Sequence, residues 1–105
     1  MLRFALRQAL VTLMLVTPVL AASPDERRGK SYALKHCARC HSIDLKSPSP
    51  LATATPLRDL HLRYPIETLA ESLAEGISTG HPAMPGSELN PDQIHDLLAF
   101  LKTLE

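Results

Sequence analysis

Both cysteines of this 105-residue chain lie in one short stretch, Cys37-Ala38-Arg39-Cys40-His41, with a histidine directly after the second. Three chemistries use such an arrangement: a redox disulfide, a metal site, and covalent attachment of a haem. In helical geometry the positions i, i+3 and i+4 share one side. The spacing therefore predicts one site that combines two thiols with an imidazole.

The alternatives to haem attachment lack their usual sequence context. A thioredoxin-like disulfide follows a strand in a βαβ unit, whereas the sequence here predicts a helix before the motif. A structural zinc site takes four protein ligands, and the chain has no third cysteine. A disulfide between positions i and i+3 would close too short a loop to constrain the chain. C-x-x-C-H is the signature of haem attachment, so we predict thioethers from Cys37 and Cys40 and an iron ligand at His41.

The first 22 residues differ from the rest and predict an export signal. Arg3 and Arg7 form a positive region, an uncharged apolar run follows, and small residues end at Ala22. The alternative is an uncleaved membrane anchor, but a span needs about 20 apolar residues, and counting back that far reaches Arg7. We therefore predict a signal peptide over 1–22, one domain over 23–105 and a periplasmic location. The protein would meet a membrane only through partners or with its signal uncleaved.

The predicted mature chain is short and poor in aromatic side chains. It has about 83 residues, no Trp, and only Tyr32, Tyr64 and Phe100 as aromatic residues. A core of this size supplies only ~3–5 kcal/mol, so small domains usually need an additional staple. A buried macrocycle could fill the core and act as that additional staple.

Charge is divided unequally along the chain. Residues 23–63 carry eight Lys/Arg and four Asp/Glu, and residues 64–105 carry one Lys and seven Asp/Glu, which leaves the mature part at −2. A chain this acidic does not favour nucleic acid as a partner.

Helical periodicity and capping signals predict three helices and no strand, an all-α fold. The first opens with a capping box at Ser23 and should reach about Cys40. The second follows Pro65 and ends at Gly76. The third opens at Asn90 and turns one apolar face inward. The long Pro- and Ser-rich connection after the motif contains one predicted helical turn, near Leu57–Leu62.

Met84 is the predicted distal iron ligand, because it is the sole methionine left once the signal is removed. It lies in a loop braced by Pro82 and Pro85. A thioether ligand opposite a histidine raises the potential of a haem. Two alternatives stay open: Met84 fills an apolar gap, or His81 is the ligand instead.

Three motifs in this order resemble a class I cytochrome c: Gly29-x-x-Tyr32 before the C-x-x-C-H motif, Gly80-His81-Pro82-Ala83-Met84-Pro85, and a final helix containing Leu97-Leu98-Ala99-Phe100-Leu101-Lys102. The resemblance, to the small bacterial periplasmic type, spans the mature chain. It implies three main helices around one covalent haem c, with the N- and C-terminal helices crossing. It also implies that Gly29 lets these helices approach and that Phe100 packs at the crossing; a merely tolerated helix glycine is the alternative.

The same resemblance implies contacts around the haem. A proline carbonyl in the loop after the motif would accept a hydrogen bond from the proximal imidazole, and Pro56 occupies the corresponding place. Arg58 and Tyr64 are candidates for contact with the haem propionates, or they simply form an exposed edge.

These inferences predict a one-electron carrier, not an enzyme, that shuttles electrons between partners such as a dehydrogenase, an oxidase or a reductase. Two alternatives stay open. In one, the iron lacks Met84 and the protein is an enzyme or a sensor of a small ligand. In the other, the chain is the haem subunit of a larger dehydrogenase or oxidase complex.

Overall fold

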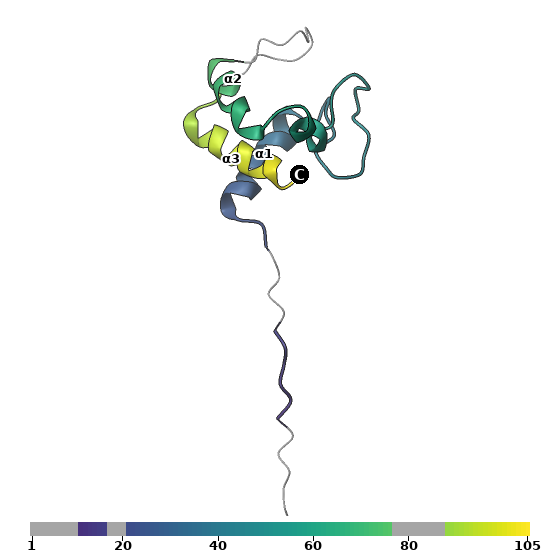
Figure 1. Ribbon diagram of the computed structural model, residues 1–105, viewed down its shortest axis with the longest axis vertical. Coiled ribbons are helices and arrows are strands. Elements are labelled where there is room, and N and C mark those ends of the chain that lie inside the picture. Colours follow the sequence, from purple (N-terminus) through teal and green to yellow (C-terminus); the bar gives the residue numbers. More distant parts are fainter. Residues whose placement is uncertain (1–10, 17–20, 77–87) are drawn as a thin grey trace, which may run out of the picture.

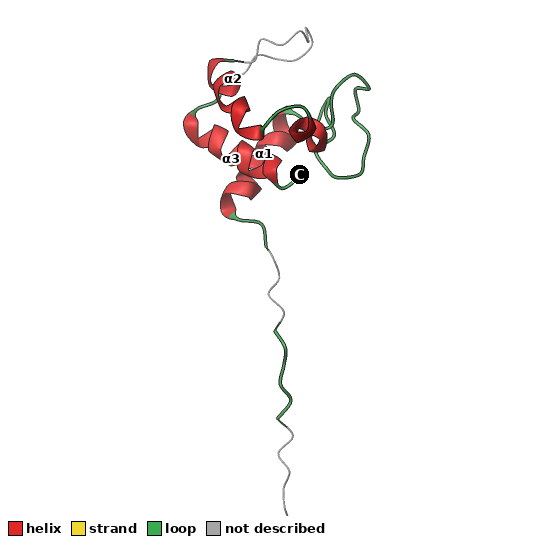
Figure 2. Ribbon diagram, viewed as in Figure 1, coloured by secondary structure: helices red, strands yellow, loops and turns green. Residues whose placement is uncertain are grey.

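The computed structural model describes residues 11–16, 21–76 and 88–105, and within them it contains helices and loops but no strand (Figure 2). The elements, in order, are α1 (Pro24–His36), η1 (Leu57–Leu62), η2 (Ile66–Thr68), α2 (Leu69–Glu75) and α3 (Pro91–Lys102), of which η1 and η2 are 3₁₀ helices. The all-α prediction is confirmed. No helix in the described part of the chain is long and apolar enough to cross a membrane.

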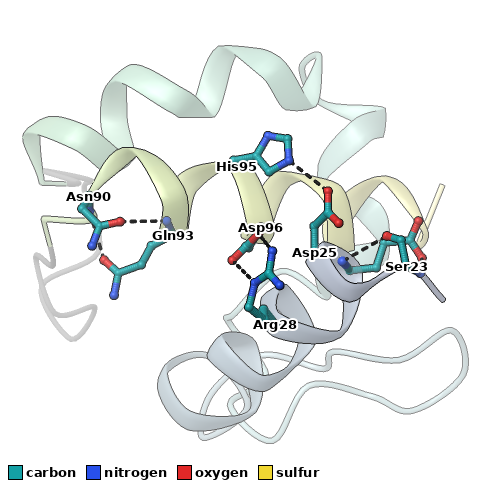
Figure 3. Close-up of polar contacts among 8 residues, drawn as sticks. Ser23, Asp25, Arg28, Asn90, Gln93, His95 and Asp96 are labelled. Carbon is teal, nitrogen blue, oxygen red and sulfur yellow. Dashed lines mark hydrogen bonds and ion pairs between the residues drawn. The ribbon is translucent and has the colours of Figure 1, made fainter.

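Two capping boxes start the helices that form the centre of the fold (Figure 3). The Ser23 hydroxyl accepts from the backbone N–H of Glu26, whose carboxylate accepts from the N–H of Ser23. Asn90 and Gln93 make the same exchange at α3, at 2.9 and 3.0 Å. Each box satisfies two backbone donors that have no partner inside the helix. Both predicted helix starts are therefore confirmed.

The other helix limits differ in part from the prediction. α1 ends at His36, and residues 37–40 form turns, because the backbone N–H groups of Cys37 and Ala38 converge on the carbonyl of Ala33. The second helix begins as the 3₁₀ turn η2 before it becomes α2. Its predicted end at Gly76 is confirmed, and the φ of 86° at that residue is a conformation that glycine adopts without strain.

α1 and α3 pack directly against each other (Figure 1). At Gly29 the backbone of α3 comes very close to α1. A Cβ on Gly29 would lie 1.9 Å from the backbone oxygen of Asp96 and 2.8 Å from the Cβ of Phe100. Phe100 is buried on α3. Glycine is therefore required by the crossing, as the resemblance implied, and is not merely tolerated in the helix.

Ion pairs on the surface flank this crossing (Figure 3). The guanidinium of Arg28 makes two hydrogen bonds to the Asp96 carboxylate, at 2.9 and 3.2 Å. His95 Nε2 lies 3.0 Å from Asp25 Oδ2. These pairs add orientation to the α1–α3 contact, although exposed pairs contribute little stability each.

One small apolar core lies among the helices. Leu89, which follows the undescribed segment, donates its N–H to the carbonyl of Leu73 at 2.9 Å and so ties the start of α3 to α2. The core comprises Ala33, Leu57, Ile66, Leu73, Leu89, Leu97, Phe100, Leu101 and Leu104. Phe100 is its sole aromatic member, which fits the prediction that side chains alone make a modest core.

Candidate functional site

The Cys37–His41 motif forms a tight turn directly after α1. The N–H groups of Cys40 and His41 both donate to the carbonyl of Cys37, at 3.1 and 2.9 Å. These bonds continue helix-like spacing through the motif, so the two cysteines and the histidine stay within about one turn of each other. Both cysteines are free thiols and both are half-buried.

Burial of Cys37 disfavours thiol–disulfide exchange and binding of a metal ion by its thiolate. Cys37 packs against the apolar core, and this desolvation raises the pKa of its thiol. A thiolate is the form that attacks disulfides and binds metals, so a raised pKa disfavours both reactions. In addition, residues 11–16, 21–76 and 88–105 contain no group of three or more His, Cys, Asp or Glu side chains that could hold a metal ion.

A short hydrogen bond fixes the His41 ring. Its Nδ1 lies 2.6 Å from the backbone oxygen of Thr55. A carbonyl oxygen can only accept a hydrogen bond, so Nδ1 carries a proton, and Nε2 is the nitrogen left for a metal. An imidazole held in this way through one nitrogen is the usual arrangement for a histidine that ligates a metal through the other.

The acceptor for His41 is Thr55, one residue before the predicted Pro56. The Pro56 carbonyl is directed elsewhere, because Pro56 precedes η1 and its oxygen accepts from the N–H of Asp59 at 2.9 Å. In this structure the histidine thus bonds to the carbonyl one residue before the predicted proline, and the role of either carbonyl toward an iron ligand stays a prediction. Proline still positions the acceptor, since it favours extended backbone at Thr55.

Arg58 contacts the loop after the motif. Its Nη1 donates to the hydroxyl of Ser42 and to the backbone oxygens of Asp44 and Ser47. These bonds use one nitrogen of the guanidinium, and contact of Arg58 with a haem propionate stays a prediction. Tyr64 follows η1 with its side chain 40% exposed, so contact with a haem edge stays a prediction for this residue.

The loop between His41 and η1 is held by further bonds that the sequence did not reveal. Ser42 is the one buried polar residue of the described chain; its N–H donates to Ser49 Oγ and its carbonyl accepts from the N–H of Leu57. Leu51 donates its N–H to the carbonyl of Cys40 at 3.0 Å. The Pro- and Ser-rich composition suggested an irregular segment, and the loop is indeed irregular but multiply anchored.

The predicted distal ligand Met84 and its rival His81 lie outside the described residues. The chain on either side of their segment is described, and its two ends meet. Gly76 and Glu88 come together there, since a Cβ on Gly76 would lie 3.5 Å from Glu88 Cγ. The last residue described before the segment and the first described after it therefore lie next to each other.

The residues present fit a covalently attached haem. Two free thiols at the required spacing are available for thioether bonds, and the bond at Nδ1 of His41 leaves its Nε2 for the iron. Large apolar side chains remain exposed on the segment after the motif and could cover a macrocycle: Leu51, Leu62 and Tyr64. Haem would also supply the internal apolar volume that the small core lacks.

Comparisons with known proteins give the same assignment. The family model described as cytochrome c matches residues 26–105. A relative from Synechocystis sp., described as "Cytochrome c-553-like", is 32% identical over 92 residues, which cover 85% of this chain and 78% of the relative. No solved structure matches the chain. The chain therefore belongs to the cytochrome c family and is a small class I c-type cytochrome, an electron carrier with covalently bound haem c.

Proposed function

We propose that this cytochrome is a one-electron carrier whose haem is attached through Cys37 and Cys40 and whose iron is ligated by His41 and Met84. The observation that carries the proposal is the bond from His41 Nδ1 to the Thr55 carbonyl. It commits one ring nitrogen to the protein and leaves Nε2 as the ligand. Met84 enters as the sole methionine of the predicted mature chain, and the described residues on either side of its segment, Gly76 and Glu88, lie next to each other.

The bound haem supplies the redox chemistry, and the chain tunes it. Thr55 orients the His41 ring and strengthens it as a donor, which stabilises ferric iron. A thioether from Met84 has the opposite effect and stabilises ferrous iron. If His41 and Met84 both hold the iron, substrates would have no open coordination site. The proposed role is therefore electron transfer and not catalysis.

Charge around the motif supports docking of acidic partners. Lys35 and Arg39 are exposed on either side of Cys37, and Lys46 is exposed on the loop that follows. Complementary charge speeds encounter between redox proteins and orients them. We propose that the partners are dehydrogenases, oxidases or reductases that present a negative surface, met either transiently or in a permanent complex.

The proposed location is the periplasm, with residues 1–22 removed as a signal peptide. Residues 11–16 lie outside the helical domain as extended, exposed chain, and all five of their large apolar side chains are exposed. An apolar segment of this kind suits recognition by export machinery more than packing in the domain. The first helix cap, at Ser23, directly follows the proposed cleavage site at Ala22.

Visible spectroscopy of the periplasmically expressed protein tests the ligand set. The reduced protein should show a low-spin c-type spectrum, and the oxidised protein should show the weak long-wavelength band of methionine bound to ferric haem. Met84→Ala should abolish that band, and His81→Ala should leave it intact. A high-spin spectrum with immediate carbon monoxide binding in the unmodified protein would instead support the enzyme or sensor alternative.

A further inference from the structure

One guanidinium nitrogen holds three points of the loop that follows the motif. Arg58 Nη1 lies 2.7 Å from the carbonyl oxygen of Ser47, 3.1 Å from Ser42 Oγ and 3.2 Å from the carbonyl oxygen of Asp44. Nη1 carries two hydrogens, so at least one of them is shared between two of these oxygens. Because the donor is charged, these contacts are stronger than bonds between neutral groups, and they link the loop to η1.

Arg58 links the two chain segments that meet in the His41–Thr55 bond. Ser42 directly follows His41, and its carbonyl accepts from the N–H of Leu57 at 2.9 Å. Arg58 adds a second, side-chain link between Ser42 and the same end of η1. Thr55 lies two residues before Leu57, so both links sit within three residues of the hydrogen bond to the ring.

We propose that Arg58 is a positioning residue for the proximal ligand: it sets the place of the Thr55 carbonyl relative to His41 and thereby tunes the reduction potential. This inference rests on the proposed role of His41 as iron ligand. A firm Nδ1–H···O=C bond makes the imidazole a better donor and stabilises ferric iron. Loosening the carbonyl should weaken that bond and raise the potential.

Arginine suits this task because its planar guanidinium holds the donating nitrogen, Nη1, in a fixed orientation at the end of a long side chain. A lysine at position 58 keeps the positive charge but is a compact point charge on a flexible stem. Its nitrogen would not be held at the place of Arg58 Nη1, so the contacts with the three oxygens would loosen. Arg58→Lys therefore separates geometry from charge, because the net charge of the loop is unchanged.

The test compares reduction potentials of the haem-loaded protein and of Arg58→Lys, Arg58→Met and Ser42→Ala. Arg27→Lys, an exposed arginine on α1, is the matched control. Arg58→Lys should raise the reduction potential by at least about 30 mV. For a one-electron couple this is roughly a threefold change in the ferric/ferrous ratio at a given potential. Ser42→Ala, which removes one acceptor, should shift it in the same direction, and Arg27→Lys should not shift it.

A second readout follows the ring proton directly. In reduced protein the His41 Nδ1 proton should exchange with solvent roughly tenfold faster in Arg58→Lys, which corresponds to about 1.4 kcal/mol of lost protection. If Arg58 stabilised the loop without influence on the ligand, its substitution would lower the denaturation midpoint of the protein. The reduction potential and the exchange rate of this proton would then stay unchanged. That result would overturn the proposal.

Charge alone makes opposite predictions. A nearby cation disfavours ferric iron, so removing it in Arg58→Met would lower the potential, and Arg58→Lys would leave it unchanged. That pattern would also refute the positioning role. Failure of the proposed ligand set would appear separately, in the unmodified protein, as the absence of a protected Nδ1 proton on a haem-bound His41.

Discussion

Replacing Gly29 by alanine tests the geometry on which the fold depends. The new Cβ would lie 1.9 Å from the Asp96 backbone oxygen, about 1.5 Å closer than the ordinary van der Waals contact of 3.4 Å. The nearest atoms belong to the backbone of α3, so rotation of a side chain cannot relieve the clash. α1 and α3 would have to separate along a buried contact that includes Ala33, Leu97 and Phe100.

The expected cost is about 3 kcal/mol, at the upper end of the range for overpacked cores, because backbone has to move. Intrinsic helix propensity acts in the opposite direction, since alanine is favoured over glycine by about 1 kcal/mol inside a helix. The two accounts of Gly29 therefore differ in sign. A tolerated glycine predicts stabilisation by alanine, and a required one predicts clear destabilisation.

The assay is denaturant unfolding of the haem-loaded protein, followed by circular dichroism. Ser31→Ala is the matched control, because Ser31 lies two positions further along α1 and is exposed. It should change the free energy of unfolding only within about 0.5 kcal/mol. The reasoning about the crossing fails if Gly29→Ala is as stable as the parent protein or more stable.

Three further predictions follow. Met84→Ala should lower the reduction potential and let the reduced protein bind carbon monoxide. If Met84→Ala left the potential unchanged and His81→Ala altered it, Met84 would not be the ligand. The chain expressed without haem should show little helical circular dichroism, because its core is too small to balance the entropy of ordering; a cooperative thermal transition would contradict this. The Asp44 carboxylate accepts from the N–H groups of Lys46 and Ser47, which lowers its pKa from 3.8 to about 2. A lowered carboxyl pKa gives stability that is present above pH 4 and is lost as pH falls toward 2. In Asp44→Asn the free energy of unfolding should therefore fall less between pH 4 and pH 2 than in the parent protein. The same fall in both proteins would argue against a contribution from Asp44.

The helix starts were predictable because their signals are local. Ser23 with Glu26, and Asn90 with Gln93, each complete a capping box within four residues. Gly76 is equally local, as a residue suited to a positive φ at a helix end. The end of α1 carries no such signal, so helical spacing was extended through the motif when the chain had in fact begun to turn.

The contacts of the loop after the motif could not be predicted in the same way. Thr55 acts through its carbonyl, which every residue possesses, and only the 3₁₀ geometry of η1 directs the Pro56 oxygen elsewhere. Arg58 contacts two backbone oxygens and one hydroxyl, 11 to 16 residues away. Sequence indicates an arginine available for pairing, and only the fold shows what it pairs with.

The central claim is that haem c is attached to this chain through Cys37 and Cys40, and intact mass spectrometry of the denatured, exported protein tests it most directly. We predict a chain that begins at Ser23 and is heavier by one haem, which survives acid–organic extraction. Cys37→Ala and Cys40→Ala should each leave at most one thioether, and the double substitution should leave none. A parent protein with the mass of the bare polypeptide, or one that loses all colour on extraction, would contradict the account.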